Sequence, residues 1–329
     1  MKLRFKSHTS ITCLWVIILV FITACETEIA STPVVENVLS DSAFLQRAAT
    51  SGKHTFDDGS VYQGDLIRGK PDGFGRREFP NGDVYEGQFD KGSFHGHGTF
   101  RYKSDPNLDR YFGNWEQNMK HGYGVLTLVD GSTWEGTWKG DSLEIGKFSG
   151  KDGLMMSGKW SGDVLTEGCL IDPFGAEFVG LFKEDGTYLR GSLMSISGEQ
   201  YVGQFEQNKY HGHGTLQSEE GLVYTGNFLE GLKAGQGILL EPDGSIYSGS
   251  FLDDLPDGIG LQKDPSGVSY SGSWEQGVKQ GNGVIDFGDG TSYTGLFENG
   301  LAVEGQYDWG DGRITNSFQD DFGNWIDSE

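Results

Sequence analysis

The chain has little positive charge. Its 329 residues include 25 lysines and arginines against 48 aspartates and glutamates, which gives a formal net charge of −23 at pH 7. A protein that binds nucleic acid neutralises phosphates with lysine and arginine, and electrostatic docking on anionic lipid needs the same basic side chains. We therefore expect no nucleic-acid partner and no electrostatic attachment to a membrane surface.

Cysteine is equally scarce. The three cysteines are Cys13, Cys25 and Cys169, and the first two lie in an N-terminal segment that is typical of an export signal. Without them, Cys169 has no cysteine left to pair with, so no disulfide framework is expected in the mature chain. We expect Cys169 to be a small packed residue.

The sequence also lacks the short motifs that carry chemistry. It has no P-loop and no Rossmann fingerprint, and no pattern pairs a nucleophile with a base. His95 and His97, with His121 nearby in the pattern, have the residue types of a metal cluster. Histidine beside Gly-x-Gly is equally an ordinary variant of the repeat described below. The acidic turns at 286–290 and 308–312 also have metal-binding residue types, but they are equally ordinary hairpin turns. We expect no metal, no cofactor and no catalytic residue, and thus a non-enzymatic protein.

The N-terminal apolar run, Ile11–Ala24, has only 14 residues, fewer than the ~20 that span a bilayer. It follows Lys2, Arg4 and Lys6, an arrangement typical of a secretory signal peptide. Its end, Ile22-Thr23-Ala24-Cys25, resembles the lipobox of bacterial lipoproteins. The alternatives are an uncleaved anchor or an ordinary signal peptide.

The lipobox resemblance implies that residues 1–24 are removed and that Cys25 is lipidated. The protein would then be exported and lipid-anchored in the bacterial cell envelope, at the outer membrane if the cell is Gram-negative. Residues 25–53 would hold the lipidated cysteine and a polar linker, with a short helix expected over residues 40–49.

Glycine, in contrast, is abundant at 53 residues, and it recurs at fixed offsets. From Tyr201 onward the pattern aromatic-x-Gly-x-aromatic returns every 23 residues, which indicates a repeat architecture. Carrying the register backward gives eleven repeats. They start at Tyr62, Tyr85, Tyr111, Trp134, Met156, Phe178, Tyr201, Tyr224, Tyr247, Tyr270 and Tyr293.

The offsets within a repeat predict a β-hairpin. The first residue, the glycine two positions on and the aromatic four positions on share one face of a strand, so two rings point the same way over bare backbone. Gly-x-Gly follows, as in Gly96 and Gly98, and a second strand leads to Asn-Gly or Asp-Gly, as in Asn81-Gly82. Such dipeptides between apolar strands favour a type I′ turn, in which both central residues have positive φ.

These motifs together resemble the MORN (membrane occupation and recognition nexus) repeat family, over roughly residues 54–312. The resemblance implies an all-β fold, an elongated twisted antiparallel β-meander or solenoid of about eleven 23-residue hairpins. It also implies a protein-interaction or scaffolding role.

The middle of the array departs from the pattern. The repeats that start at Trp134, Met156 and Phe178 lack Gly-x-Gly. We expect an N-terminal arm (54–133), degenerate repeats with a bend (134–198), a C-terminal arm (199–312) and a cap (313–329) that covers the last edge.

A long sheet lined with aromatic rings is a natural surface for a peptide or helix. The leading hypothesis is a membrane-anchored scaffold with a protein partner. The alternative is a carbohydrate- or peptidoglycan-binding lipoprotein whose tryptophans stack on sugars, and the degenerate, Trp-rich repeats are the favoured place for function. The candidate binding face consists of Tyr85, Phe89, Tyr111, Trp115, Trp134, Trp138, Trp160, Tyr201 and Phe205.

Overall fold

The computed structural model describes residues 52–327, and every regular element in that range is a β-strand. The expected signal peptide, Cys25 and the helix expected over residues 40–49 lie outside the described residues, and only residues 52 and 53 of the predicted linker are described. Between residues 52 and 327, no helix has the length and apolar character needed to cross a membrane. The chain divides into two compact units, residues 1–186 and 187–329.

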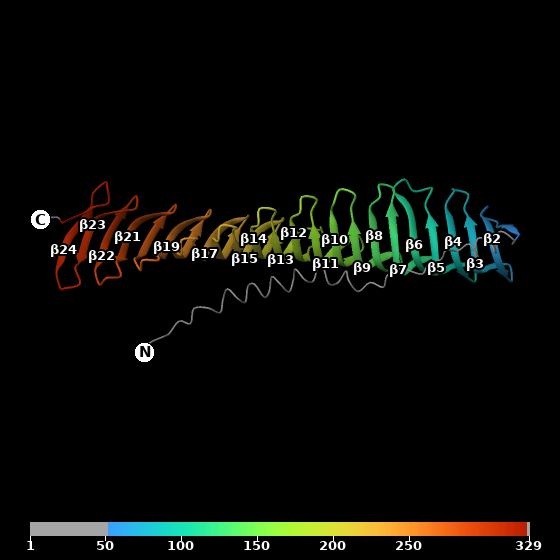
Figure 1. Ribbon diagram of the computed structural model, residues 1–329, viewed down its shortest axis with the longest axis horizontal. Coiled ribbons are helices and arrows are strands. Elements are labelled where there is room, and N and C mark those ends of the chain that lie inside the picture. The colour runs from blue at the N-terminus through green and yellow to red at the C-terminus, as the bar shows by residue number, and fades with distance from the viewer. Residues whose placement is uncertain (1–51, 328–329) are drawn as a thin grey trace, which may run out of the picture. The chain divides into compact units, whose positions relative to one another are not determined.

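In the first unit the hairpins lie side by side (Figure 1), and each strand pairs antiparallel with the next one in sequence. The strands are β1 (Lys53–Thr55), β2 (Val61–Ile67), β3 (Lys70–Glu78), β4 (Val84–Asp90), β5 (Ser93–Arg101), β6 (Leu108–Glu116), β7 (Met119–Leu128), β8 (Thr133–Lys139), β9 (Ser142–Ser149), β10 (Met155–Ser161), β11 (Val164–Ile171) and β12 (Glu177–Phe182).

The second unit repeats this arrangement, again with sequential antiparallel pairing. Its strands are β13 (Tyr188–Met194), β14 (Gln200–Glu206), β15 (Lys209–Gln217), β16 (Val223–Leu229), β17 (Leu232–Leu240), β18 (Ile246–Leu252), β19 (Leu255–Lys263), β20 (Ser269–Glu275), β21 (Val278–Asp286), β22 (Ser292–Glu298), β23 (Leu301–Asp308), β24 (Ile314–Gln319) and β25 (Trp325–Asp327).

Both units are antiparallel meanders of hairpins, which confirms the all-β class. The degenerate repeats at Trp134 and Met156 still form hairpins, β8–β9 and β10–β11. The division between the units falls after Gly186, inside the degenerate stretch. The bend expected over 134–198 and the other segment boundaries stay predictions, and the last residues of the described chain add β24 and β25 to the edge of β23.

Each regular repeat is held by a tyrosine ring that lies on paired glycines. Gly226 and Gly237 are cross-strand partners, and the Tyr224 ring covers them. A Cβ on Gly226 would lie 2.5 Å from the Tyr224 hydroxyl and 2.6 Å from the Cα of Gly237. The Tyr224 hydroxyl donates to the carbonyl oxygen of Asn227 at 3.0 Å. Only glycine fits here, because any side chain would displace a fully buried ring.

The aromatic core then continues from one repeat to the next. The Tyr224 ring contacts Phe228 of its own repeat and Phe251 of the following one edge to face, with both centroid distances 5.0 Å. Tyr201 makes the same contacts with Phe205 and Phe228, at 5.0 and 5.1 Å. Edge-to-face geometry of this kind is the preferred arrangement of aromatic pairs.

The type I′ prediction for the Asn-Gly and Asp-Gly turns is wrong. Gly82 has φ of 88°, but Asn81 is not among the described non-glycine residues with positive φ. The amide of Gly82 donates to the Phe79 carbonyl, and that of Phe79 donates to the Asp83 carbonyl, both at 2.9 Å. This is a three-residue loop closed by a glycine bulge. The side chain of Asn81 accepts the Asp83 amide at 3.1 Å, which stabilises that shape.

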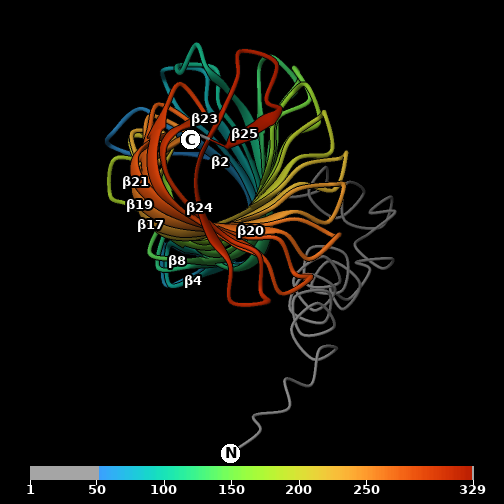
Figure 2. The ribbon, with the colours of Figure 1, turned by 90° about the vertical axis from the view of Figure 1, so that its left-hand side faces the viewer.

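Two consecutive residues with positive φ occur instead in the other turn, inside most hairpins. Lys91 and Gly92 have φ of 50° and 97°, and Gln207 and Asn208 have 50° and 60°. The first glycine of Gly-x-Gly also has positive φ, 58° at Gly235, and a register shift occurs beside its partner strand between Gly226 and Asn227. Figure 2 shows that the strands are strongly curved, as bulges of this kind require.

Candidate binding surfaces

The residues predicted to form a binding face are mostly core residues. Eight of the nine are at most 7% exposed, and only Trp134 is partly exposed. The eight buried ones are Tyr85, Phe89, Tyr111, Trp115, Trp138, Trp160, Tyr201 and Phe205. Their rings pack on glycines and on one another, so they offer almost no area to a partner.

The indole N–H groups of three of these tryptophans also donate hydrogen bonds to backbone carbonyls. The N–H of Trp115 donates to the Gly98 carbonyl at 3.1 Å, and those of Trp138 and Trp160 donate to the Gly124 and Gly146 carbonyls at 3.0 Å. A sugar cannot stack on a ring that is buried and hydrogen-bonded in this way. The observation that motivated the glycan alternative is therefore absent for these three tryptophans.

His121 and the acidic turns have local structural roles. Nδ1 of His121 lies 3.2 Å from a carboxylate oxygen of Glu116. In the acidic turns Asp289 accepts the backbone amide of Thr291 at 2.9 Å, and hydrogen bonds from Thr291 lower the pKa of that aspartate. Between residues 52 and 327, no group of three or more histidine, cysteine or acidic side chains is placed to hold a metal ion.

The second unit carries exposed aliphatic side chains on the outer face, the face opposite the tyrosine rings. Eight of them lie on β16–β19 and are between 40% and 67% exposed. We name this set the outer aliphatic patch: Leu229, Leu232, Ile238, Ile246, Leu252, Leu255, Ile259 and Leu261. Contiguous exposed apolar surface usually marks an interaction site.

Cross-strand pairing places part of the patch in one row across the strands. Ile238 lies opposite Ser248, and Ser248 lies opposite Leu261. The row continues through Ser271 to Val284, so aliphatic and hydroxyl side chains alternate from strand to strand. Because the hydroxyl side chains between them are small, the aliphatic side chains stay accessible to a partner that approaches the outer face.

The repeat itself does not require this apolar surface. At the same positions in the first unit, Arg76 pairs with Glu86 at 2.9 Å, and Lys147 pairs with Glu135 at 2.8 Å. Those residues are cross-strand neighbours on the outer face, as Ile238 and Ser248 are. The fold therefore does not require an apolar outer face, and exposed aliphatic side chains continue beyond the patch at Val278 and Val284 on β21.

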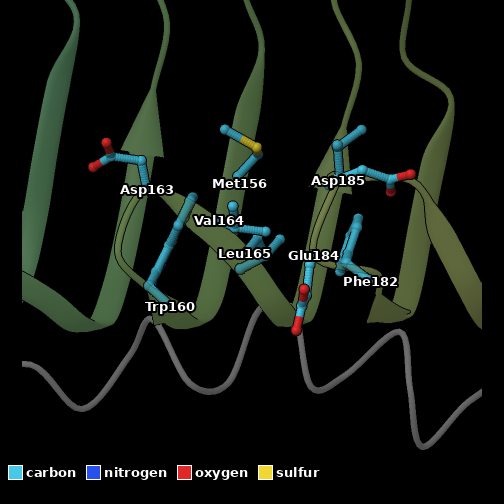
Figure 3. Close-up of a pocket in the computed structure, with 10 residues that line it drawn as sticks. Met156, Trp160, Asp163, Val164, Leu165, Phe182, Glu184 and Asp185 are labelled. Carbon is cyan, nitrogen blue, oxygen red and sulfur yellow. The ribbon is translucent and has the colours of Figure 1, made fainter.

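The first unit contains a hollow of about 260 Å³ in the degenerate repeat that starts at Met156 (Figure 3). Apolar side chains form its walls, and three carboxylates from two turns line it as well. The walls are Met156, Trp160, Val164, Leu165, Leu170 and Phe182, and the carboxylates belong to Asp163, Glu184 and Asp185.

The hollow occupies the place of a missing tyrosine ring. In a regular repeat, Tyr201 stacks on Tyr210 with a centroid distance of 3.9 Å and contacts Phe205 and Phe228. The equivalent positions around Met156 are Leu165, Trp160 and Phe182, which are three of the residues that line the hollow. Methionine has no ring to fill that space.

Hairpins that stack a tyrosine ring on paired glycines, one per repeat, define a repeat protein of the β-hairpin class. The MORN repeat model matches residues 62–84, 85–105, 111–133, 201–223, 224–246, 247–269, 270–292 and 293–312, more than half of the chain. The chain belongs to the MORN repeat family, as its motifs indicated. It is thus a repeat protein of a kind that serves protein or membrane interaction.

The solved structures that resemble the chain do so weakly. The TCP domain of SAS-4 (dCPAP) from Drosophila melanogaster, solved with a proline-rich motif of Ana2 (dSTIL), is 13% identical, with a TM-score of 0.31, over 52% of this chain and 86% of that one. The G-box domain of the microcephaly protein CPAP gives 11% identity and a TM-score of 0.19, over 68% and 92%. A mutant TCP10 domain of Danio rerio CPAP gives 12% and 0.17, over 84% and 99%.

TM-scores of this size support no transfer of structure or function. A search of curated proteins gave no match.

Sequence reasoning missed both surfaces. The signal for the patch was the aliphatic residue fourteen positions after the tyrosine, at Ile238, Leu261 and Val284. The signal for the hollow was Met156 at a tyrosine position, followed by Leu165 where the Tyr85 and Tyr201 repeats have Phe94 and Tyr210.

Proposed function

We propose that this protein is a non-enzymatic, membrane-anchored MORN-repeat scaffold that holds a protein partner at the bacterial cell envelope. The outer aliphatic patch carries the proposal, because it is an exposed apolar surface that the fold does not require. The tether would be the acylated Cys25 of the lipobox, at the outer membrane in a Gram-negative cell. A non-enzymatic role is consistent with the described titratable groups, whose most strongly raised pKa values belong to core tyrosines.

The charge around the patch indicates which partner fits. Glu230 and Asp253 lie in the turns at one end of β16–β19, and Glu241 and Asp243 lie at the other end. A second copy of this chain would bring the same negative turns against them, which is unfavourable. We therefore propose a partner protein with an aliphatic centre and a basic rim.

The double variant Ile238→Ser/Leu261→Ser should weaken partner binding at least tenfold. It removes two exposed aliphatic side chains and extends the serines already present at Ser248 and Ser271, so the strands should keep their structure. Burial of an aliphatic side chain contributes on the order of 1.5–3 kcal/mol, and 1.4 kcal/mol corresponds to about tenfold in affinity. A photo-crosslinking residue in place of Ile259, used in intact cells, would identify the partner, and titration with the purified partner would measure the affinity.

The matched control is Val125→Ser, which removes an aliphatic side chain at the same repeat position in the first unit. It should leave partner affinity unchanged. Binding should also weaken as salt is raised, because rim charges are screened. Equal affinities for wild type and the double variant would refute the patch as the docking surface.

Cys25→Ala should abolish lipidation and release the protein from the membrane. Two or more acyl chains give stable anchoring, since each buried CH₂ contributes about 0.8 kcal/mol. Without acyl chains, the variant would have no membrane anchor. Palmitate labelling and membrane fractionation would measure this in wild type and variant. Cys169 is disulfide-bonded in the structure, so the expectation that it has no disulfide partner is wrong and it does not serve as a control. Label that persists in Cys25→Ala would reject the lipoprotein assignment.

A further inference from the structure

We propose that the partner docks on the outer aliphatic patch through an extended segment in the polyproline II conformation, which crosses the strands along one row of side chains. The proposal rests on the proposed scaffold function and names the part of the partner that makes the contact. We call this row the hydroxyl–aliphatic row. It crosses β16 to β22 in the second unit (Figure 1) and consists of Thr225, Ile238, Ser248, Leu261, Ser271, Val284 and Thr294, each the cross-strand neighbour of the next.

Aliphatic and hydroxyl side chains alternate along the whole of this row. Ile238, Leu261 and Val284 are 53%, 45% and 39% exposed, and the threonines and serines beside them are exposed as well. In the first unit the same row carries Arg76, Glu86, Thr99 and Phe112. The alternation therefore follows from the choice of residues and not from the hairpin fold.

The hydroxyls of the row can donate hydrogen bonds to a ligand. Within residues 52–327, those of Ser248, Ser271 and Thr294 have no hydrogen-bond partner, and that of Thr225 shares one hydrogen bond with Thr215 at 3.0 Å. A purely aliphatic partner would bury these hydroxyls without an acceptor, which is unfavourable. The row therefore fits a ligand that presents apolar side chains and unpaired acceptors together.

The polyproline II conformation provides both. It has no internal hydrogen bonds, so its carbonyl oxygens are open to donors. It repeats every three residues, or about 9.3 Å, so that each turn brings one side chain and one carbonyl to the same face. Equivalent members of the row lie two strands apart, which is about 9.6 Å at a strand separation of ~4.8 Å. The two periods agree.

The other regular conformations match the row less well. An α-helix returns to the same face after seven residues, about 10.5 Å. Over the length of the row, three such repeats are about 3 Å too long, whereas three turns of polyproline II differ by about 1 Å. The carbonyls of a helix are also bonded within it, so the hydroxyls would find no acceptor. A β-strand presents side chains to one face about every 6.8 Å, out of step with the row.

The charge around the row selects the residues that flank the segment. Glu230 and Asp253 border the row at one end of the strands, and Asp243 and Asp286 border it at the other end. Lys263 is a basic exception on the second border. Because the acidic side chains outnumber it, lysine or arginine beside the aliphatic residues of the segment favours binding, and an acidic or phosphorylated segment is disfavoured.

The test uses the full-length protein in detergent, labelled with ¹³C in the isoleucine methyl groups. The probe is acetyl-Arg-Pro-Pro-Val-Pro-Pro-Val-Pro-Pro-Val-Pro-Pro-Arg-amide, in which valine returns every third residue. Its matched control has the same residues with the valines at every second position, so that they point in different directions around the polyproline II axis. The Ile238 methyl signal should shift saturably with the probe, and affinity for the control peptide should be at least tenfold lower. Ile145, on β9 of the first unit, is 56% exposed and should not shift.

The double variant Ser248→Ala/Ser271→Ala separates this contact from simple hydrophobic docking. It makes the row more apolar, so a ligand held by apolar contact alone would bind equally or more tightly. Loss of two donors should instead weaken probe binding at least fivefold. Ser248→Thr/Ser271→Thr keeps both donors, as Thr225 and Thr294 do, and should bind like wild type. Both serines are exposed, so neither substitution removes a core contact.

Several results would overturn the proposal. They are the absence of a saturable Ile238 shift, equal affinity for the probe and the control peptide, and unchanged or higher probe affinity in Ser248→Ala/Ser271→Ala. Tighter binding of a helical leucine–alanine peptide with the same terminal arginines would assign the patch to a helix instead. An Ile238 signal that shifts with protein concentration alone would assign it to a second copy of this chain.

These outcomes are separable from those of the scaffold proposal. If the probe fails but Ile238→Ser/Leu261→Ser weakens binding of the natural partner, the polyproline II contact alone is rejected. If the probe binds as expected but that double variant leaves partner affinity unchanged, the patch is rejected as the docking surface of that partner. The row then still stands as a binding site for polyproline II segments.

Discussion

Gly237→Ala is expected to destabilise the second unit by about 3–5 kcal/mol, the magnitude seen when a buried ring loses its site. A Cβ at this position would lie 2.5 Å from Cε2 and 2.6 Å from Cζ of Tyr224. That ring is fully buried and touches Phe228 and Phe251, so it cannot move aside cheaply. Urea unfolding followed by circular dichroism would give the free energy of unfolding.

The control for Gly237→Ala separates lack of space from backbone strain. Gly221 has φ of 95° and open space around the position of a Cβ. Gly221→Ala should therefore cost only about 1 kcal/mol, the usual penalty for a side chain at positive φ. If both variants lose the same stability, the paired glycines are not selected by the ring above them.

A double-mutant cycle tests the same contact directly. Tyr224→Ala alone should cost about 3–5 kcal/mol, because it removes a buried ring. When the ring is gone, the added methyl of Gly237→Ala meets no aromatic atoms, so the double variant should cost less than the two single variants combined. An interaction free energy of about 2 kcal/mol is expected, and additivity would show that Tyr224 and Gly237 are not coupled.

The fold could be predicted from the sequence because most repeats use the same residues at the same offsets to pack a tyrosine ring on paired glycines. Tyr224, Gly226 and Gly237 recur at fixed offsets, and no other residue than glycine allows a ring to lie on the backbone of both strands. The turn types could not be assigned as well. Asp-Gly and Asn-Gly are compatible with two loop geometries. The aspartate or asparagine side chain accepts a hydrogen bond from the amide two residues on, as Asn81 does from Asp83, and this stabilises the three-residue loop.

The binding surfaces could not be located in the same way. Sequence shows that Tyr201 and Phe205 share a face, but it does not show that Phe228 of the next repeat covers Tyr201. That contact depends on the curvature of the strands. Likewise, Ile238 and Leu261 are 23 residues apart, and they become parts of one patch only through Ser248, which pairs with both.

Alkaline pH is expected to unfold the protein cooperatively, and this is the largest effect that we predict. Burial raises the pKa of four repeat tyrosines, Tyr62, Tyr201, Tyr224 and Tyr247, to about 12, from an ordinary value of 10. Each hydroxyl donates to a backbone carbonyl at 2.9–3.0 Å. A phenolate has no proton to donate, so it would face that carbonyl oxygen unfavourably in a buried site.

The sign of the pH effect follows from the direction of the shift. Because the folded-state pKa is above the unfolded value, the stability contribution is complete below pH 10 and is lost as pH rises through 12. One pKa unit corresponds to 1.36 kcal/mol. Ionisation of each of the four tyrosines therefore lowers the free energy of unfolding by about 2–3 kcal/mol. Three of these tyrosines, Tyr201, Tyr224 and Tyr247, lie in the second unit, so their ionisation removes a large part of the stability of an ordinary domain.

Absorbance of tyrosinate and circular dichroism, recorded together between pH 8 and 13, would follow ionisation and unfolding. Both signals should change in one steep transition above pH 10, since the buried hydroxyls ionise only as the strands separate. Tyr224→Phe keeps the ring but cannot ionise, so it should be about 1 kcal/mol less stable than wild type at pH 8. That deficit should shrink as the pH approaches 12. Gradual ionisation near pH 10 with an unchanged circular dichroism spectrum would contradict the assignment of these hydroxyls to the core.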